Sequence, residues 1–156
     1  MRTMILVWAA ALAAALLAVP PAKASEKTEV IATVEQYMGS INKGDKAAMI
    51  AVCAAQASII DDFPPHAWQG ATACADWWND NEAFGKKNGI TDENIVLREP
   101  RHTEITGDRA YIVVPTTYTY KQHGKPVTET RAVWTLALQK VPAGWRITGW
   151  AWAEGH

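Results

Sequence analysis

The chain has 156 residues, of which 49% are hydrophobic and 20% are charged. This length and apolar content support one globular domain with a substantial core. The formal net charge is −1 and the basic residues form no stripe, which argues against nucleic acid as a partner.

The first 24 residues have the pattern of a secretory signal peptide. Arg2 precedes an apolar run over residues 4–19, and Ala22-Lys23-Ala24 forms a small-x-small cleavage site. The run is short for a membrane-spanning helix, so a signal peptide is favoured over an uncleaved anchor. We therefore expect a periplasmic or secreted mature domain of residues 25–156, with no membrane segment after cleavage and a net charge of about −3.

Hydrophobic periodicity predicts three helices followed by long strands. Apolar side chains recur at helical spacing over residues 26–42, 46–55 and 71–87. A short strand is predicted at 57–61, and further strands at 94–106 with an interruption at Pro100, 109–121 with a bulge or edge at Pro115, 127–140 and 145–153. This order indicates an α+β fold in which helices cover one face of a curved, mostly antiparallel sheet and leave a pocket between the two layers.

Cys53 and Cys74 are the two cysteines of the chain. Export would permit a disulfide between them, and the pattern equally allows two buried free thiols, each on the apolar face of its own helix. No cysteine or histidine pair has the spacing of metal ligands, so no metal site is predicted.

Two adjacent carboxylates follow the short strand in the stretch ASIIDDFPPHAWQG, residues 57–70. Strand alternation puts Asp61 on the side of the buried residues and Asp62 on the other. An inward carboxylate in an apolar pocket has a raised pKa and is suited to general-base chemistry. The alternative is that one aspartate caps the turn that precedes the two prolines.

His66 and Trp68 come directly after this turn. His66 is a candidate for relaying a proton or binding a polar ligand group, and otherwise an exposed loop histidine. Trp68 either covers the mouth of the pocket or packs under the third helix.

The mature domain has seven tryptophans. Trp134 shares a strand face with leucines, and Trp152 shares a face with Trp150, opposite Ile147. These rings form a core or a dimer interface, or they line a pocket for a flat, apolar ligand.

The chain resembles the NTF2-like superfamily, in particular its SnoaL-like and ketosteroid-isomerase-like branch. The resemblance covers the mature chain and rests on Tyr37 with residues 41–45 (INKGD), on residues 57–61 with Gly70, and on the closing residues 144–147 (GWRI). It implies an NTF2-like cone of three N-terminal helices packed on a strongly curved mixed sheet. It also implies a pocket that works without a cofactor and a homodimer that pairs through the sheet.

Two residues match the ketosteroid-isomerase pattern. In that family a tyrosine on the first helix donates a hydrogen bond to the substrate oxyanion, and an aspartate after the first short strand shuttles the proton. Tyr37 and Asp61 are similar in order and separation. The family's third residue, a protonated aspartic acid on the penultimate strand, has no counterpart in residues 134–137 (WTLA).

The sequence therefore predicts an exported domain that binds a small hydrophobic carbonyl compound and isomerises or hydrates it. Asp61 and Tyr37 are the expected catalytic residues, and the expected ligand-binding residues are Asp62, His66, Trp68, Trp134 and Trp152. Because the strand acid is missing, a non-catalytic binding domain is one alternative. A protein-interaction or dimerisation domain is a second alternative, because the sheet is rich in tryptophan.

Overall fold

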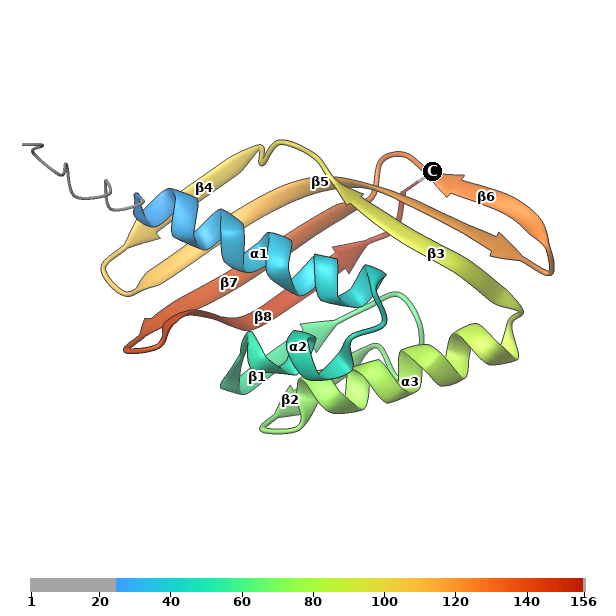
Figure 1. The fold of residues 1–156 in the computed structure, drawn as a ribbon, viewed down its shortest axis with the longest axis horizontal. Coiled ribbons are helices and arrows are strands. Elements are labelled where there is room, and N and C mark those ends of the chain that lie inside the picture. Colours follow the sequence, from blue (N-terminus) through green and yellow to red (C-terminus); the bar gives the residue numbers. More distant parts are fainter. Residues whose placement is uncertain (1–24, 156) are drawn as a thin grey trace, which may run out of the picture.

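The computed structural model describes residues 25–155, so the predicted signal peptide lies outside the described residues. The elements in chain order are α1 (Glu26–Asn42), α2 (Lys46–Ala51), β1 (Cys53–Ile60), β2 (Ala67–Gly70), α3 (Ala73–Lys87), β3 (Ile90–Leu97), β4 (His102–Thr106), β5 (Arg109–Gln122), β6 (Lys125–Glu129), β7 (Val133–Val141) and β8 (Gly144–Ala153) (Figure 1). No helix in this part of the chain is long and apolar enough to cross a membrane.

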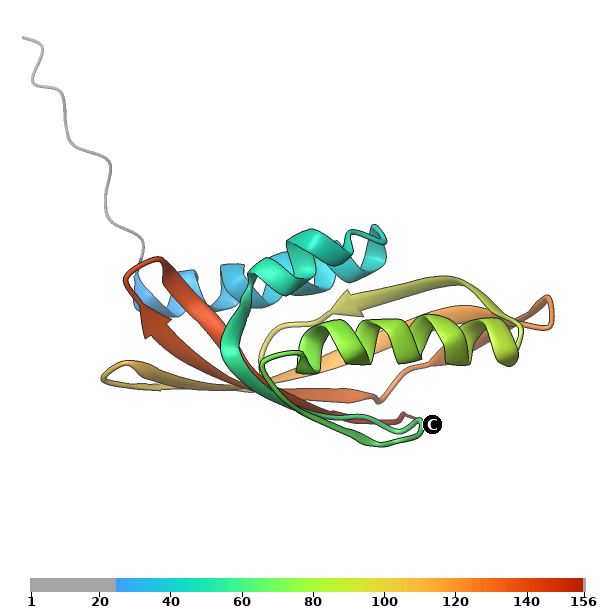
Figure 2. The ribbon, with the colours of Figure 1, turned by 90° about the horizontal axis from the view of Figure 1, so that it is seen from below.

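Eight strands form one curved sheet, and the three helices lie on the same face of it (Figure 2). The strand order is β2-β1-β8-β7-β5-β3, with β4 and β6 also paired to β5. β1 and β8 are parallel, and the other pairs are antiparallel. The predicted α+β cone with a mixed, mostly antiparallel sheet is confirmed.

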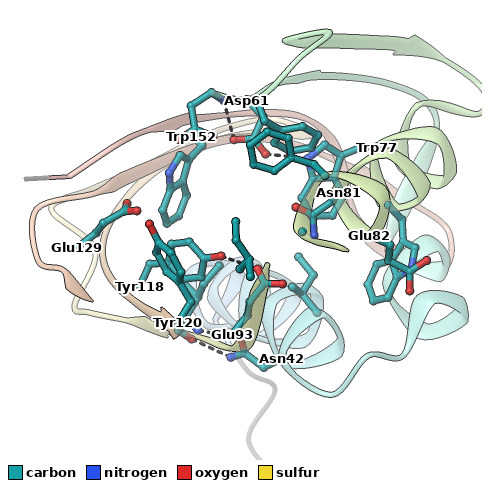
Figure 3. Close-up of a pocket in the computed structure, with 18 of the residues that line it drawn as sticks. Asn42, Asp61, Trp77, Asn81, Glu82, Glu93, Tyr118, Tyr120, Glu129 and Trp152 are labelled. Atoms are coloured by element: carbon teal, nitrogen blue, oxygen red, sulfur yellow. Dashed lines mark hydrogen bonds between the residues drawn. The ribbon is translucent and has the colours of Figure 1, made fainter. Parts of the chain in front are cut away.

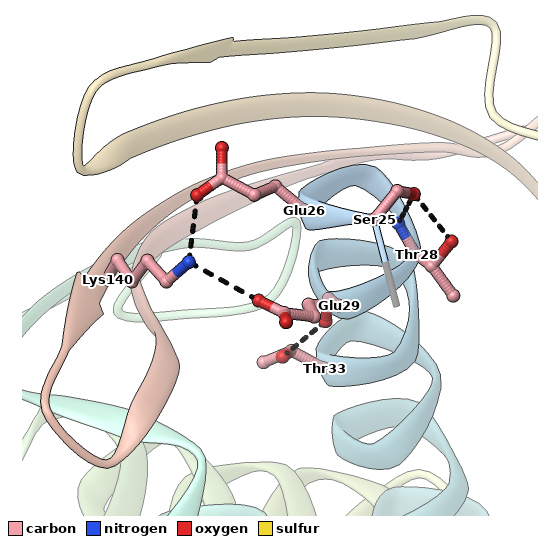
Figure 4. Close-up of polar contacts among 6 residues, drawn as sticks. All are labelled: Ser25, Glu26, Thr28, Glu29, Thr33 and Lys140. Atoms are coloured by element: carbon pink, nitrogen blue, oxygen red, sulfur yellow. Dashed lines mark hydrogen bonds and ion pairs between the residues drawn. The ribbon is translucent and has the colours of Figure 1, made fainter. Parts of the chain in front are cut away.

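α1 has the predicted bounds, and its first turn is fixed at two points. Ser25 caps the helix by accepting a hydrogen bond from the backbone N–H of Thr28 at 3.2 Å. Lys140 on β7 places its Nζ 2.8 Å from Glu26 and 3.5 Å from Glu29 (Figure 4). These acids also interact favourably with the positive end of the helix dipole. The cap and the contact with the sheet together fix the start of α1.

The second helix ends earlier than the sequence predicts. It was expected to reach residue 55, but α2 ends at Ala51 and β1 begins at Cys53. β1 pairs with β8 from its first residue, and the N–H of Ile147 donates to the carbonyl of Val52 at 2.9 Å. Tertiary pairing here overrides the local helix preference of the alanines.

β2 is a strand that the sequence analysis missed. Residues 67–70 pair antiparallel with β1, so the stretch from β1 to Gly70 is a hairpin and not a strand followed by a loop. The two prolines lie in its turn, where the N–H of His66 donates to the carbonyl of Phe63 at 2.9 Å. A four-residue strand directly after a proline pair carries too little alternation to be recognised.

Each of the two predicted strands that flank β5 is two strands in the structure, and the break between β3 and β4 falls at the interruption predicted at Pro100. β4 pairs with the first half of β5 and β3 with the second half, and β7 and β6 divide the other edge of β5 in the same way. Pro115 marks the exchange: it is the last residue paired to β7, and Thr116 instead donates its N–H to the carbonyl of Ala132 at 2.9 Å. The proline therefore lies where β5 passes from its partners β4 and β7 to its partners β3 and β6.

A bulge at Thr148 corrects the predicted facing of the last strand. The register between β7 and β8 shifts at this residue, so Ile147 and Trp150, expected on opposite faces, are both buried. Gly149 is needed just after the bulge, because a Cβ there would lie 2.5 Å from the carbonyl oxygen of Ser58 on β1.

Candidate functional site

A pocket of about 420 Å³ lies between the inner face of the sheet and helices α1 and α3 (Figure 3). Its apolar wall is mostly aromatic, formed by Phe63, Trp77, Trp78, Phe84, Tyr118, Tyr120, Trp134, Trp150 and Trp152. Cavities of this size and lining are typical of small-molecule sites. The tryptophans that the sequence could not assign are thus divided: several line the pocket, and Trp145 is buried away from it.

Asp61 lines this pocket directly after β1. The strand alternates so that Ala57 and Ile59 are buried and Ile60 is 55% exposed, which turns the next side chain inward as predicted. Its Oδ2 accepts a hydrogen bond from Nε1 of Trp77 at 2.7 Å, and its Oδ1 accepts one from the backbone N–H of Asp62 at 2.9 Å. The carboxyl is therefore held in one orientation by a helix and by its own turn.

Burial dominates the electrostatics of this carboxyl. It raises the pKa of Asp61 to about 7, and the two hydrogen bonds, which favour the charged form, only partly offset it. The neighbouring charge of Asp62 raises the pKa further. A carboxyl that titrates near neutral pH can both accept and return a proton under ordinary conditions.

Changing Trp77 to phenylalanine tests the role of the indole. Loss of its N–H removes a hydrogen bond to the charged form, so the pKa of Asp61 should rise by roughly one unit. The change is measured by carbon NMR of labelled aspartate carboxyls during a pH titration. Trp78→Phe is the matched control, because Trp78 also lines the pocket but its indole makes no hydrogen bond to Asp61. An equal pKa of Asp61 in the two variants would contradict the role of the Trp77 indole.

Tyr37 does not reach the pocket surface, contrary to the expectation. Its side chain is fully buried, its ring packs on Trp134 with centroids 5.5 Å apart, and it is not among the lining residues. Its hydroxyl oxygen accepts a hydrogen bond from Nε1 of Trp150 at 3.0 Å. Burial raises the pKa of Tyr37 above its ordinary value. In this structure Tyr37 is a core residue behind the pocket wall, because Trp134 and Trp150 cover it.

His66 and Trp68 also lie off the pocket. His66 is exposed in the hairpin turn with its Nδ1 3.2 Å from the carbonyl oxygen of Asp61. Trp68 packs under α3, where Nε1 donates to Oδ2 of Asp80 at 2.8 Å and the ring contacts Phe63. The other three expected ligand-binding residues, Asp62, Trp134 and Trp152, do line the pocket.

Cys53 and Cys74 form a disulfide, which decides between the two alternatives of the sequence analysis. It joins the start of β1, which leads into Asp61, to the start of α3, which carries Trp77. Cys53 lies in a strand and not on a helix face as expected. The bond therefore fixes the two segments whose side chains meet at the candidate base.

The sequence analysis missed the polar side of the pocket. Tyr118, Tyr120, Glu93 and Glu129 all line it, and the hydroxyl of Tyr118 donates to Oε2 of Glu93 at 2.5 Å. The two tyrosines alternate along β5, a pattern that signals a shared face. The acids gave no local signal, since Glu93 precedes the predicted start of its strand at residue 94, and Glu129 lies next to a break between β6 and β7 that the sequence did not show.

No group of three or more acidic, histidine or cysteine side chains within residues 25–155 is arranged to hold a metal ion. The pocket carboxylates are spread around its wall (Figure 3).

A family model described as the SnoaL-like domain matches residues 30–151. The chain belongs to the SnoaL-like domain family. A search of curated proteins finds no match to its sequence.

Solved structures with the same fold as this SnoaL-like domain are numerous and distant. A ketosteroid isomerase-like protein from Erwinia carotovora atroseptica is 17% identical, with a TM-score of 0.66 over 83% of this chain and 95% of that one. An NTF2-like superfamily protein from Salmonella enterica serovar Typhimurium is 18% identical, with a TM-score of 0.70 over 84% and 92%. The CaMKII hub of S. rosetta is 17% identical, with a TM-score of 0.68 over 88% and 100%. At these identities the likeness establishes the fold, and the chemistry has to come from the site.

Proposed function

We propose that this SnoaL-like domain binds a small apolar carbonyl compound in its pocket and isomerises or hydrates it without a cofactor, with Asp61 as the general base. The observation that carries the proposal is the half-buried Asp61 carboxyl, whose pKa is about 7, inside an aromatic pocket. The resemblance of Asp61 to the proton-shuttling aspartate of ketosteroid isomerases supports the same class of reaction.

In the proposed isomerisation the Asp61 carboxylate removes a proton from the carbon next to the carbonyl. The electron pair moves onto the carbonyl oxygen, and the same carboxyl returns the proton to another carbon. Asn81 is the proposed donor to the developing oxyanion in place of Tyr37. It lies four residues after Trp77 on α3, hence on the same helix face, and its amide lines the pocket (Figure 3).

Turnover of a β,γ-unsaturated cyclic ketone by the mature domain, lost in Asp61→Asn, tests the proposal. A ligand that binds in the pocket and is returned unchanged would instead favour the non-catalytic binding domain.

Export is part of the proposal, and the disulfide supports it because such bonds persist in oxidising compartments. The exported protein should begin at Ser25 by mass spectrometry.

We further propose that the domain forms a homodimer through the outer face of the sheet. On this face, cross-strand neighbours of β5, β7 and β8 form a patch without a charged side chain, made of Tyr111, Val113, Pro115, Val133, Thr135, Ala137, Gly149, Ala151 and Ala153. Tyr111 is 46% exposed in the single chain. A contiguous uncharged patch of this kind is typical of an interface between subunits.

Ala137→Glu should convert the dimer to a monomer, because it places a charge beside Tyr111 in the patch, where pairing would bury it. The measurement is the molar mass by light scattering on a sizing column. Ala83→Glu is the matched control, since Ala83 is exposed on α3, which lies against the other face of the sheet. A monomeric wild-type domain, or a dimer that Ala137→Glu leaves intact, would contradict this interface.

A further inference from the structure

The charges that line the pocket all have one sign. Its ionisable residues that carry charge are carboxylic acids, namely Asp61, Asp62, Glu82, Glu93, Glu129 and Glu154, and no lysine, arginine or histidine is among the described lining residues. Binding of a neutral ketone alone does not require this excess of carboxylic acids over basic residues. The resulting negative potential disfavours anionic ligands and attracts cationic ones.

Glu129 is the one buried side chain among these six acids. Its side chain is only 8% exposed, and its Oε2 is buried without a hydrogen-bond partner. Burial and the charges of Glu154 and Asp62 raise its pKa, while hydrogen bonds from the backbone of Gly155 and the side chain of Tyr120 favour the charged form. A buried carboxylate oxygen without a partner is costly, so this oxygen is suited to a positive group supplied by a ligand.

Aromatic rings flank this carboxylate. Tyr118 is its cross-strand neighbour, the rings of Tyr118 and Tyr120 lie 4.6 Å apart, and Trp152 meets Tyr118 edge-on at 6.1 Å. Figure 3 shows Glu129, Trp152 and Tyr118 facing the same open space. Aromatic faces beside an acid are the usual recognition elements for organic ammonium groups.

The spread of the acids favours an organic cation over a metal ion. No three of them converge to the coordination distance of one ion in the described chain, whereas an ammonium group needs one acid and several ring faces. On the opposite side of the pocket, Trp77 and Phe84 supply further aromatic surface, which would hold the body of such a molecule.

We propose that the pocket takes an apolar molecule bearing one protonated amine or quaternary ammonium group, with that group beside Glu129 and against Tyr118, Tyr120 and Trp152. This inference rests on the proposed small-molecule-binding function and narrows its ligand class. It leaves Asp61 free to act on the part of the ligand that lies on the α3 side.

The test compares two ligands of the same shape, phenyltrimethylammonium and tert-butylbenzene, which differ in a positive nitrogen and a neutral carbon. Both are titrated into the mature domain at neutral pH, and binding is followed by tryptophan fluorescence and by NMR chemical shifts. The cation should bind the wild-type domain about tenfold more tightly or better. Glu129→Gln should remove most of this preference and leave the affinity for tert-butylbenzene unchanged.

Glu104→Gln is the control, because it removes the same charge from the exposed strand β4, away from the pocket. Equal or tighter binding of tert-butylbenzene by the wild-type domain would overturn the inference and leave the proposed binding function intact. A cation preference that survives Glu129→Gln, or that Glu104→Gln removes equally, would also overturn it. Binding of neither ligand would overturn the inference, and the cyclic ketone assay would then decide the proposed function separately.

Discussion

Asp61→Asn should lower turnover of a β,γ-unsaturated cyclic ketone by about a thousandfold, the middle of the range for loss of a general base. The amide keeps the size of the side chain but cannot accept the proton. In the wild-type domain, the rate should rise with pH through about 7, because the active form is the carboxylate and burial holds its pKa there. The rate of the variant should show no such rise. The measurement is the initial rate by ultraviolet absorbance between pH 5 and 9.

Asp62→Asn is the comparison for this experiment. Asp62 also lines the pocket, and its charge raises the pKa of Asp61. The variant should therefore stay active while the midpoint of its pH profile moves to lower pH. An Asp61→Asn variant with wild-type activity, or a midpoint that Asp62→Asn moves upward, would exclude Asp61 as the base.

Replacing both Cys53 and Cys74 with alanine should lower the free energy of unfolding by about 3 kcal/mol. The bond closes a short loop with a sequence separation of 21 residues, and it ties β1 to α3. The value comes from urea denaturation of the oxidised wild-type domain and the double variant, with the reduced wild-type domain as the control. The reduced domain and the double variant should agree. A difference between oxidised and reduced protein well below 1 kcal/mol would mean that packing alone holds these elements together.

The helices and the inward facing of Asp61 were predictable because they follow from local periodicity. α1 has the predicted bounds, and the buried residues of β1 alternate up to the aspartate as expected. The end of α2, the strand β2 and the break between β6 and β7 were not predictable, because pairing between distant strands sets them. The break between β3 and β4 was predicted, because Pro100 marks it in the sequence. The bulge at Thr148 likewise depends on β7 and changed the facing of Ile147.

The sequence predicted Asp61 as the general base of the site, but it predicted fewer of the residues around Asp61. Tyr37 has the position expected from the family resemblance, but Trp134 and Trp150 lie between it and the pocket, and their packing is a tertiary property. Trp77 was not among the residues expected at the site, and only the fold shows that its indole meets Asp61. Glu129 is the last residue of β6 and lies next to the break between β6 and β7. The sequence predicts one continuous strand there, so it gave no sign that Glu129 lines the pocket.

The most direct test of the account is a pH titration of the Asp61 carboxyl by carbon NMR, in the free mature domain and with a neutral phenol bound. The account predicts a midpoint near 7 in the free domain and a clear shift when the phenol occupies the pocket. A midpoint near 4, unchanged by the phenol, would show a solvated carboxylate outside the binding site and would contradict the central claim.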